Sequence, residues 1–158
     1  MFLNPEHVLS QVRFKDAVSI GDLGAGAGAF SIPLAKRLRP YGEVIAVDLN
    51  PNILSYLSGR SRDEGLSNLY VVQGDIERPL GSGIKDAVLD AVLVTNTLFQ
   101  LDKQQNALEE INRVLKPQGR VLVVDWVDSF GGIGPESKRV IPKERVQKLF
   151  LENGFTLY

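Results

Sequence analysis

The feature that most constrains this chain is a glycine-rich turn between a short apolar run and a helix. Residues 17–20 form a β-type apolar run, and glycines follow at positions 24, 26 and 28 before a helix opens near Ala29. A tight strand-to-helix turn needs glycine, because glycine adopts positive φ freely and leaves room for a ligand against the backbone. The free N–H groups at the new helix end can then face a polar or anionic ligand. A glycine turn without any ligand remains a possible reading of this segment alone.

Two acidic residues stand where such a ligand site needs them. Asp22 comes directly before the glycines, at the C-terminal end of the first predicted strand, where doubly wound sheets bind ligands. Asp48 ends the apolar run of residues 42–48, which suits a parallel strand covered on both faces. An acid at the end of the second strand can hydrogen-bond a ribose diol in nucleotide-binding units. The spacing favours this role for Asp48 over that of an acid that begins a loop.

The rest of the chain alternates between strand and helix patterns. Further strands are predicted at 68–73, 86–95 and 120–127, and helices at 5–12, 30–38, 51–65, 102–115 and 142–153. We expect side-chain N-caps at Asn4, Asn50 and Asp102. The alternation predicts an α/β fold, a doubly wound and mainly parallel sheet with helices on both faces. No internal repeat or interdomain linker is visible, so we expect residues 1–158 to form a single domain.

Composition excludes several classes of function. The formal net charge of −1 gives no support for nucleic-acid binding, and the absence of cysteine excludes thiolate metal sites and a cysteine nucleophile. We expect a cytoplasmic protein without stable membrane association, because no apolar run approaches the ~18 residues of a membrane span and the first residues lack signal-peptide features. His7 has no acid or second histidine at a useful spacing. We therefore expect a surface histidine and no metal site.

The segment Asp22-Leu-Gly-Ala-Gly-Ala-Gly28 resembles motif I of the class I S-adenosylmethionine-dependent methyltransferases. A second segment, Leu115-Lys-Pro-Gln-Gly119, is similar to the leucine-lysine-proline-glycine-glycine turn before strand five in many members, with Gln118 in place of the first glycine. The resemblance extends over about residues 8–155. It implies the Rossmann-like methyltransferase fold and S-adenosyl-L-methionine as the cofactor, with S-adenosyl-L-homocysteine as the product.

The resemblance also implies roles for individual residues of the ligand rim. Gly24 and Gly26 would lie against the methionine portion of the cofactor, with Asp22 near its ammonium group. Asp48 would hold the ribose hydroxyls, and Leu49 would pack on the adenine. Asp75 and Ile76 would contact the adenine edge, and the Asn96 backbone would meet the amino-acid end. The predicted cofactor site therefore consists of Asp22, Leu23, Gly24, Ala25, Gly26, Asp48, Leu49, Asp75, Ile76 and Asn96.

The sequence specifies the residues around the methyl acceptor less closely than those around the cofactor. Thr97 and Phe99 follow the fourth predicted strand on the same rim and Trp126 closes the fifth, so these three are the candidate substrate-binding residues. Leu98 and Phe99 suit the core equally well. We assign no catalytic base, because methyl transfer requires one only when the acceptor is protonated. Trp126 and the glycine-rich loop from Gly131 resemble small prokaryotic methyltransferases similar to the quinone-biosynthesis enzymes, which implies a small, hydrophobic acceptor.

The chain departs from the family near its end. Members continue with two further strands, an antiparallel hairpin beside strand five, whereas this sequence stops at Gly154-Phe-Thr-Leu-Tyr158. We therefore expect a domain truncated near strand six, with the last β-hairpin missing or incomplete and strand five at an edge. A fragment is the first explanation, a homodimer formed through this edge the second, and cover by the last residues the third.

Two alternative functions remain at this point. The segment Gly24-Ala-Gly-Ala-Gly-Ala29 also satisfies the Gly-x-Gly-x-x-Ala pattern of an NAD(P)-binding oxidoreductase domain, whose ribose Asp48 would serve equally well. A non-catalytic domain that binds S-adenosylmethionine is the third class. Asp22 and the turn at residues 115–119 favour the methyltransferase over the oxidoreductase.

Overall fold

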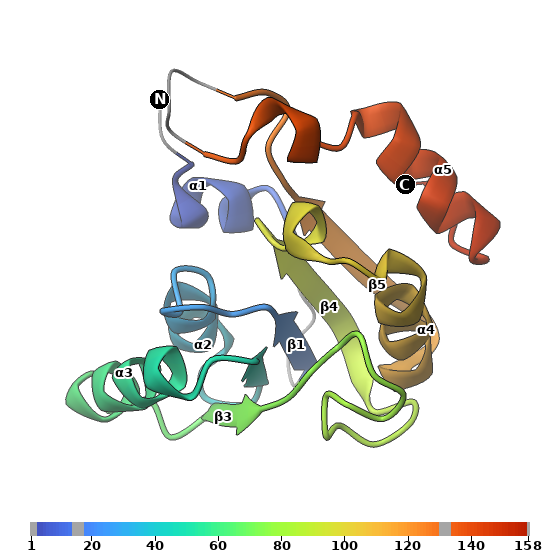
Figure 1. Ribbon diagram of the computed structural model, residues 1–158. Coiled ribbons are helices and arrows are strands. Elements are labelled where there is room, and N and C mark those ends of the chain that lie inside the picture. Colours follow the sequence, from blue (N-terminus) through green and yellow to red (C-terminus); the bar gives the residue numbers. More distant parts are fainter. Residues whose placement is uncertain (1–2, 14–17, 130–133, 158) are drawn as a thin grey trace.

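The computed structural model describes residues 3–13, 18–129 and 134–157. Within these ranges five strands form one parallel sheet in the order β3-β2-β1-β4-β5 (Figure 1). The chain runs from β1 through β2 to β3 on one side, then crosses to β4 and β5 on the other side of β1. The predicted doubly wound α/β fold is confirmed, and its strand order reverses beside β1, where such sheets bind ligands. The strands are β1 (Ser19–Leu23), β2 (Glu43–Asp48), β3 (Leu69–Gln73), β4 (Leu89–Thr95) and β5 (Leu115–Val124).

Helices cover both faces of the sheet and form two apolar clusters. One cluster contains Leu9, Leu34 and Leu57 from α1, α2 and α3, and the other contains Ile111 and Phe150 from α4 and α5. Figure 1 shows the same division, with α2 and α3 on one side of the strands and α4 and α5 on the other. The helices are α1 (Pro5–Ser10), α2 (Ser31–Leu38), α3 (Pro51–Asp63), α4 (Gln104–Val114) and α5 (Lys143–Glu152), with single 3-10 turns η1 (Leu98–Gln100) and η2 (Ser137–Arg139). None of these helices combines the length and apolar character needed to cross a membrane.

Two of the three expected N-caps are present. Asn4 Oδ1 accepts a hydrogen bond from the His7 N–H at 3.2 Å, and Asn50 Oδ1 accepts one from the Asn52 N–H at 3.0 Å. The prediction for Asp102 is wrong, because α4 begins one residue later with Lys103 as its N-cap residue. The Lys103 N–H instead donates to the carboxylate of Glu77, which comes from the loop after β3. A tertiary contact thus replaces the local cap.

Several predicted boundaries shift for local reasons. β4 begins at Leu89 rather than at residue 86, because Ala87 has a φ of 52° and its N–H bonds to the Arg113 carbonyl. β5 begins earlier than expected, at Leu115, and ends at Val124 rather than at residue 127. Other shifts are smaller: β1 extends through Asp22 to Leu23, α2 begins at residue 31 rather than near 29, and the predicted strand residue Ala17 lies outside the described ranges.

The turn predicted at residues 115–119 is a bulge within β5. Leu89 pairs with Leu115, but Ala91 pairs with Arg120, so four residues of β5 bulge out against β4. Gln118 lies in this bulge with a φ of 65°, a conformation that favours glycine. Among the described strands β5 pairs only with β4, and its last residues are half-buried, so it stands at the edge of the sheet as expected.

Candidate cofactor site

The glycine turn is held against the end of β2. The N–H groups of Gly24 and Ala25 both donate to the Val47 carbonyl, at 2.8 and 3.0 Å. Gly24 has a φ of 83°, and a Cβ at this position would lie 2.3 Å from Thr97 Oγ1. Glycine is therefore required at position 24 for its conformation and for the close approach of Thr97.

Gly26 forms the open part of the turn. Its φ is 53°, and a Cβ built on it would meet no heavy atom within 4 Å. Its N–H donates to Asp48 Oδ2 at 2.8 Å, and Asp48 Oδ1 accepts from the Asn50 N–H at 2.9 Å. The two carboxyl oxygens of Asp48 thus bridge the turn after β1 and the segment after β2. The space beside Gly26 leaves this backbone accessible to a ligand.

Asp22 lies completely buried beneath the turn. Its Oδ2 accepts a hydrogen bond from the Ser31 hydroxyl, whereas its Oδ1 is buried without a partner. Burial raises the pKa of Asp22 to about 6; the Ser31 hydrogen bond lowers it and the nearby Asp48 charge raises it further. A buried carboxyl oxygen without a donor is unfavourable, so a cationic N–H donor from a ligand would fit here. The ammonium group of S-adenosylmethionine is such a donor.

The residues predicted to contact adenine lie in the segments after β2 and β3. Asp75 Oδ1 accepts from the Glu77 N–H at 3.0 Å, and Asp75 Oδ2 pairs with Arg78 Nε at 3.0 Å. Ile76 is buried in the cluster under α4. Leu49, at the end of β2, has an exposed fraction of 63%. An apolar side chain left exposed at this rim is available to pack on a flat ring.

The segment after β4 supplies the predicted acceptor side. Asn96 has a φ of 52°, and its N–H donates to the Val124 carbonyl at 2.7 Å. Thr97 is buried and contacts Gly24, whereas Phe99 in η1 is half-buried. Leu98 is fully buried, so of the two roles considered for it, core or acceptor site, it has the core role.

Trp126 follows the end of β5 and packs on the loop beyond it. A Cβ added to Gly134 would lie 2.6 Å from the indole ring. Residues 131–133 of the glycine-rich loop that we expected on the rim lie outside the described ranges. His7 is exposed on α1, as expected, and its ring bonds to the Gln11 side chain at 3.0 Å. The described residues contain no group of acids and histidines that could hold a metal ion.

Three further residues at this rim were not predicted from the sequence. Ser31 bonds to Asp22, and Arg60 on α3 donates to the Ala27 carbonyl of the glycine turn at 3.1 Å. Asp125 follows β5, and burial raises its pKa although backbone N–H groups of Trp126 and residues 97–99 lower it. The rule applied to Asp48, an acid that ends an apolar strand, did not select Asp125, because the predicted strand ran on to residue 127 whereas β5 ends at Val124. Nothing in the sequence pairs Ser31 or Arg60 with the turn.

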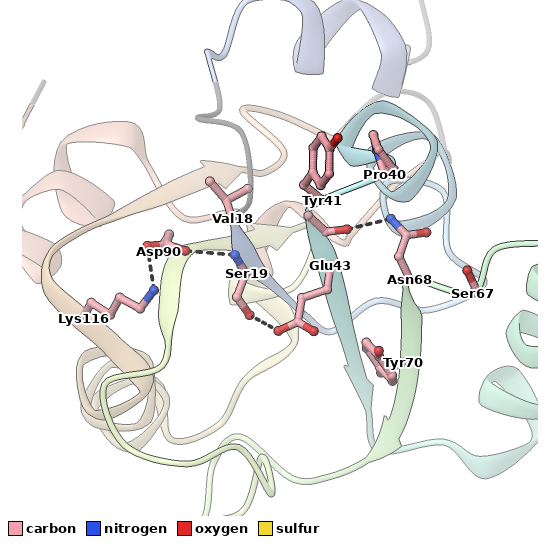
Figure 2. Close-up of a pocket in the computed structure, with 11 residues that line it drawn as sticks. Val18, Ser19, Pro40, Tyr41, Glu43, Ser67, Asn68, Tyr70, Asp90 and Lys116 are labelled. Atoms are coloured by element: carbon pink, nitrogen blue, oxygen red, sulfur yellow. Dashed lines mark hydrogen bonds and ion pairs between the residues drawn. The ribbon is translucent and has the colours of Figure 1, made fainter.

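A separate pocket of about 380 Å³ lies at the opposite end of the sheet (Figure 2). It is lined by residues at the starts of the strands, among them Ser19 and Glu43. Its polar groups pair with one another: the Ser19 N–H and Lys116 Nζ both reach Asp90 at 2.9 Å, and the Ser19 hydroxyl donates to Glu43 at 2.7 Å. Ligands of doubly wound sheets bind at the other ends of the strands, so this pocket is not the candidate site.

Comparisons with known proteins agree with this geometry. A family model described as "Methyltransferase domain" matches residues 14–153. The demethylmenaquinone methyltransferase of Staphylococcus carnosus is 30% identical over 120 residues, which are 76% of this chain and 48% of that protein. The ubiquinone/menaquinone biosynthesis C-methyltransferase of Blochmanniella pennsylvanica is 32% identical over 106 residues, 66% of this chain and 41% of that protein. The chain thus spans about half the length or less of these curated relatives.

A solved structure extends the likeness to nearly the whole chain. The crystal structure of an S-adenosylmethionine-dependent methyltransferase from Aquifex aeolicus superposes with a TM-score of 0.88 at 25% identity. The match covers 98% of this chain and 81% of that one.

Proposed function

Because this chain belongs to the methyltransferase-domain family and has the class I S-adenosylmethionine-dependent methyltransferase fold, we propose that it binds S-adenosylmethionine at the glycine turn. The observation that carries the proposal is Asp22 Oδ1, a fully buried carboxyl oxygen without a hydrogen-bond partner beneath an open glycine backbone. An ammonium group supplies the donor that this oxygen lacks. A nicotinamide dinucleotide offers a diphosphate to the same turn, and a buried carboxylate would repel it.

The proposed binding mode follows the rim of the sheet. Asp22 holds the ammonium group, the backbone of residues 23–26 supports the methionine portion, and the Asn96 backbone meets its amino-acid end. Asp48 accepts hydrogen bonds from the ribose hydroxyls after giving up its bond to the Gly26 N–H. Leu49 and Ile76 hold the adenine ring, and Asp75 accepts from its exocyclic amine.

The proposed reaction is methyl transfer to a small acceptor. The cofactor supplies a methyl group already activated on a positively charged sulfur. The protein holds the acceptor atom, the methyl carbon and the sulfur in line and excludes water, and positioning of this kind lowers a barrier by ~7–11 kcal/mol. Thr97, Phe99 and Trp126 form the acceptor side of the proposed site. No side chain is assigned as a base.

We propose an aromatic quinol as the acceptor class, because the named relatives are methyltransferases of demethylmenaquinone and of ubiquinone and menaquinone biosynthesis. An electron-rich ring carbon of the reduced quinol attacks the methyl group, and the same carbon then releases its proton to water. The half-buried Phe99 offers an aromatic surface of matching character. A methyl-transfer assay with reduced demethylmenaquinone tests this part of the proposal.

Calorimetric titration of the purified chain with S-adenosylhomocysteine, and in parallel with NAD, tests the cofactor. We expect micromolar binding of S-adenosylhomocysteine and no heat with NAD. The Asp75→Ala variant should weaken S-adenosylhomocysteine binding, whereas Asp48→Ala weakens either cofactor and does not separate the classes. Binding of NAD alone would overturn the proposal. Binding of S-adenosylhomocysteine without methyl transfer to any quinol would identify a non-catalytic binding domain.

We also propose a cytoplasmic protein that neither binds nucleic acid nor associates stably with membranes, and a homodimer formed through the edge of β5. The edge proposal is supported by the half-buried residues 121–124, whose backbone pairs with β4 on one side. Light scattering coupled to size-exclusion chromatography measures the mass in solution. A monomer at all concentrations refutes the homodimer and leaves the cofactor proposal unaffected.

A further inference from the structure

Glu110 on α4 is a buried charge outside the proposed contacts with the cofactor. Its exposed fraction is 2%. The N–H groups of Leu80 and Ser82 donate to its two carboxyl oxygens at 3.1 and 3.0 Å, and Arg113 Nε donates at 2.9 Å. The Ser82 hydroxyl adds a further bond at 2.5 Å. Burial raises the pKa of Glu110, but hydrogen bonds from Arg113 and Ser82 outweigh it and bring the pKa to about 2. Glu110 therefore remains a fully bonded carboxylate at any working pH.

The segment that Glu110 holds belongs to the loop between β3 and β4, which begins with Gly74 and Asp75. Gly81 lies between the two residues whose N–H groups reach Glu110. The Gly81 carbonyl accepts the Asp75 N–H at 2.8 Å, and a Cβ on Gly81 would lie 2.0 Å from the Asp75 carbonyl oxygen. The two backbone segments are thus in direct contact. A displacement of residues 80–82 must displace Asp75 as well.

The same loop contains a strained backbone conformation, which the contact with Glu110 holds in place. Leu80 has a φ of 60°, although it is not a glycine and its side chain is exposed. A non-glycine residue keeps such a conformation only where its surroundings fix it. The hydrogen bond from the Leu80 N–H to Glu110 is a fixing contact of this kind. Loss of the carboxylate charge weakens the bond and allows Leu80 to relax.

A second contact ties the loop to α4. Asn106 Nδ2 donates to the Glu77 carbonyl at 3.0 Å, and the Glu77 carboxylate accepts the Lys103 N–H at the start of the helix. Glu77 is also the residue whose N–H bonds to the Asp75 carboxylate. Asp75 is therefore attached to α4 from both sides, through Glu77 and through Gly81.

We propose that Glu110 is a positioning residue for adenine recognition, which fixes the Asp75 carboxylate through Leu80, Gly81 and Ser82. The inference rests on the proposed function, because it takes Asp75 as the acceptor of the adenine amine. A hydrogen bond to a charged group discriminates only if the acceptor stays in place. The consequence is specific: weakening the Glu110 contacts lowers selectivity for the purine amine and not merely stability.

The experiment compares S-adenosylhomocysteine with S-inosylhomocysteine, in which a carbonyl replaces the exocyclic amine. Affinities are measured by calorimetry well below the melting temperature of each variant. The parent chain should prefer S-adenosylhomocysteine by about tenfold or more, the value of one hydrogen bond to a charged acceptor. In Glu110→Gln, which keeps the shape and removes the charge, this preference should fall by about tenfold.

Controls separate positioning from general destabilisation. Glu109→Gln changes the neighbouring exposed acid, which bonds only to Gln105 at 3.2 Å among the contacts described, and should keep the parent preference. Asp75→Asn should abolish the preference, and adding Glu110→Gln to it should cause no further loss of selectivity. Ser82→Ala removes one hydroxyl contact to Glu110 and replaces Glu110→Gln in the experiment if that variant does not fold. It should also lower the preference for S-adenosylhomocysteine over S-inosylhomocysteine.

The outcomes are distinguishable. A parent chain that does not bind S-adenosylhomocysteine overturns the proposed function, and this inference with it. A parent that binds both ligands equally overturns the inference and the assignment of the adenine amine to Asp75, but it leaves the proposed cofactor class intact. The inference is also wrong if the parent discriminates and both Glu110→Gln and Ser82→Ala keep the parent ratio.

Discussion

The titration of Asp22 should control cofactor affinity. Asp22 is completely buried, and burial raises its pKa to about 6. The protonated carboxyl group is neutral and cannot attract an ammonium group as a carboxylate does. Binding of S-adenosylhomocysteine therefore favours the ionised form of Asp22, and by linkage the affinity must fall as Asp22 becomes protonated.

The size of the expected loss in affinity follows from the pKa of Asp22. At about pH 5, one unit below the pKa of Asp22, only about one tenth of the free protein carries the carboxylate. Near pH 7.5 almost all of it does. The affinity for S-adenosylhomocysteine should therefore drop about tenfold, or ~1.4 kcal/mol, between these two conditions. Above about pH 7 the affinity should be constant, because Asp22 is already ionised.

Calorimetric titration over this pH range, repeated in buffers with different heats of ionisation, measures both the affinity and the protons released. We expect release to approach one proton per site at the acidic end. Asp22→Asn should bind weakly at every pH and show no slope. His7→Gln should keep the slope, because His7 is exposed on α1. An affinity of the parent chain that does not change with pH, or an Asp22→Asn variant that keeps the slope, refutes the assignment of the ammonium group to Asp22.

Three further predictions concern stability. The pKa of Asp22 is near 3.8 in the unfolded chain and about 6 in the folded state, so the folded state binds this proton more tightly. Ionisation of Asp22 therefore lowers the stability of the fold as pH rises through about 6. In chemical denaturation, Asp22→Asn should be up to about 3 kcal/mol more stable than the parent near pH 7.5, with a smaller gain at lower pH. Gly26→Ala should fold, with its free energy of unfolding lowered by about 1–2 kcal/mol because of the positive φ, and it should bind S-adenosylhomocysteine at least tenfold more weakly. Gly24→Ala should be far less stable than Gly26→Ala, because its Cβ would collide with Thr97. Gln118→Gly should raise the melting temperature by about 2–4 °C, because glycine tolerates a φ of 65° without strain, and Gln118→Ala should not.

Local signals in the sequence were enough to predict the sheet and the five α-helices of the described residues. Alternating apolar runs and turn residues predicted the five parallel strands, and Asn4 and Asn50 predicted two helix starts. These predictions succeed because each signal lies within a few residues of the structure it determines. The rim location of the predicted site residues follows from the same logic. In a parallel sheet the residues that end successive strands meet at one edge, so Asp22, Asp48 and Asn96 share an edge.

Contacts between distant segments could not be predicted in this way. The Glu77 carboxylate replaces Asp102 as the partner at the start of α4, although Glu77 lies 26 residues before the N–H it accepts. Glu110 and Ser82 are 28 residues apart and form one buried network. Gln118 keeps the bulge without the glycine of the family pattern, because the pairing of β5 with β4 on both sides holds its backbone. Each of these features depends on packing of the folded chain.

The distribution of unsatisfied polar atoms is itself an argument for the site. Among the described residues three buried side-chain oxygens have no hydrogen-bond partner, and two of them, Asp22 Oδ1 and Asp125 Oδ2, belong to acids at the carboxyl ends of β1 and β5. These strands flank β4, whose end carries Asn96 and Thr97. Asp48 and Asp75, by contrast, have both carboxyl oxygens bonded by the chain itself. A folded chain normally satisfies its buried polar groups, and exceptions concentrate where a ligand completes them. The unpaired oxygens on both sides of β4 therefore support the proposal that a cationic or N–H-bearing ligand binds at this end of the sheet.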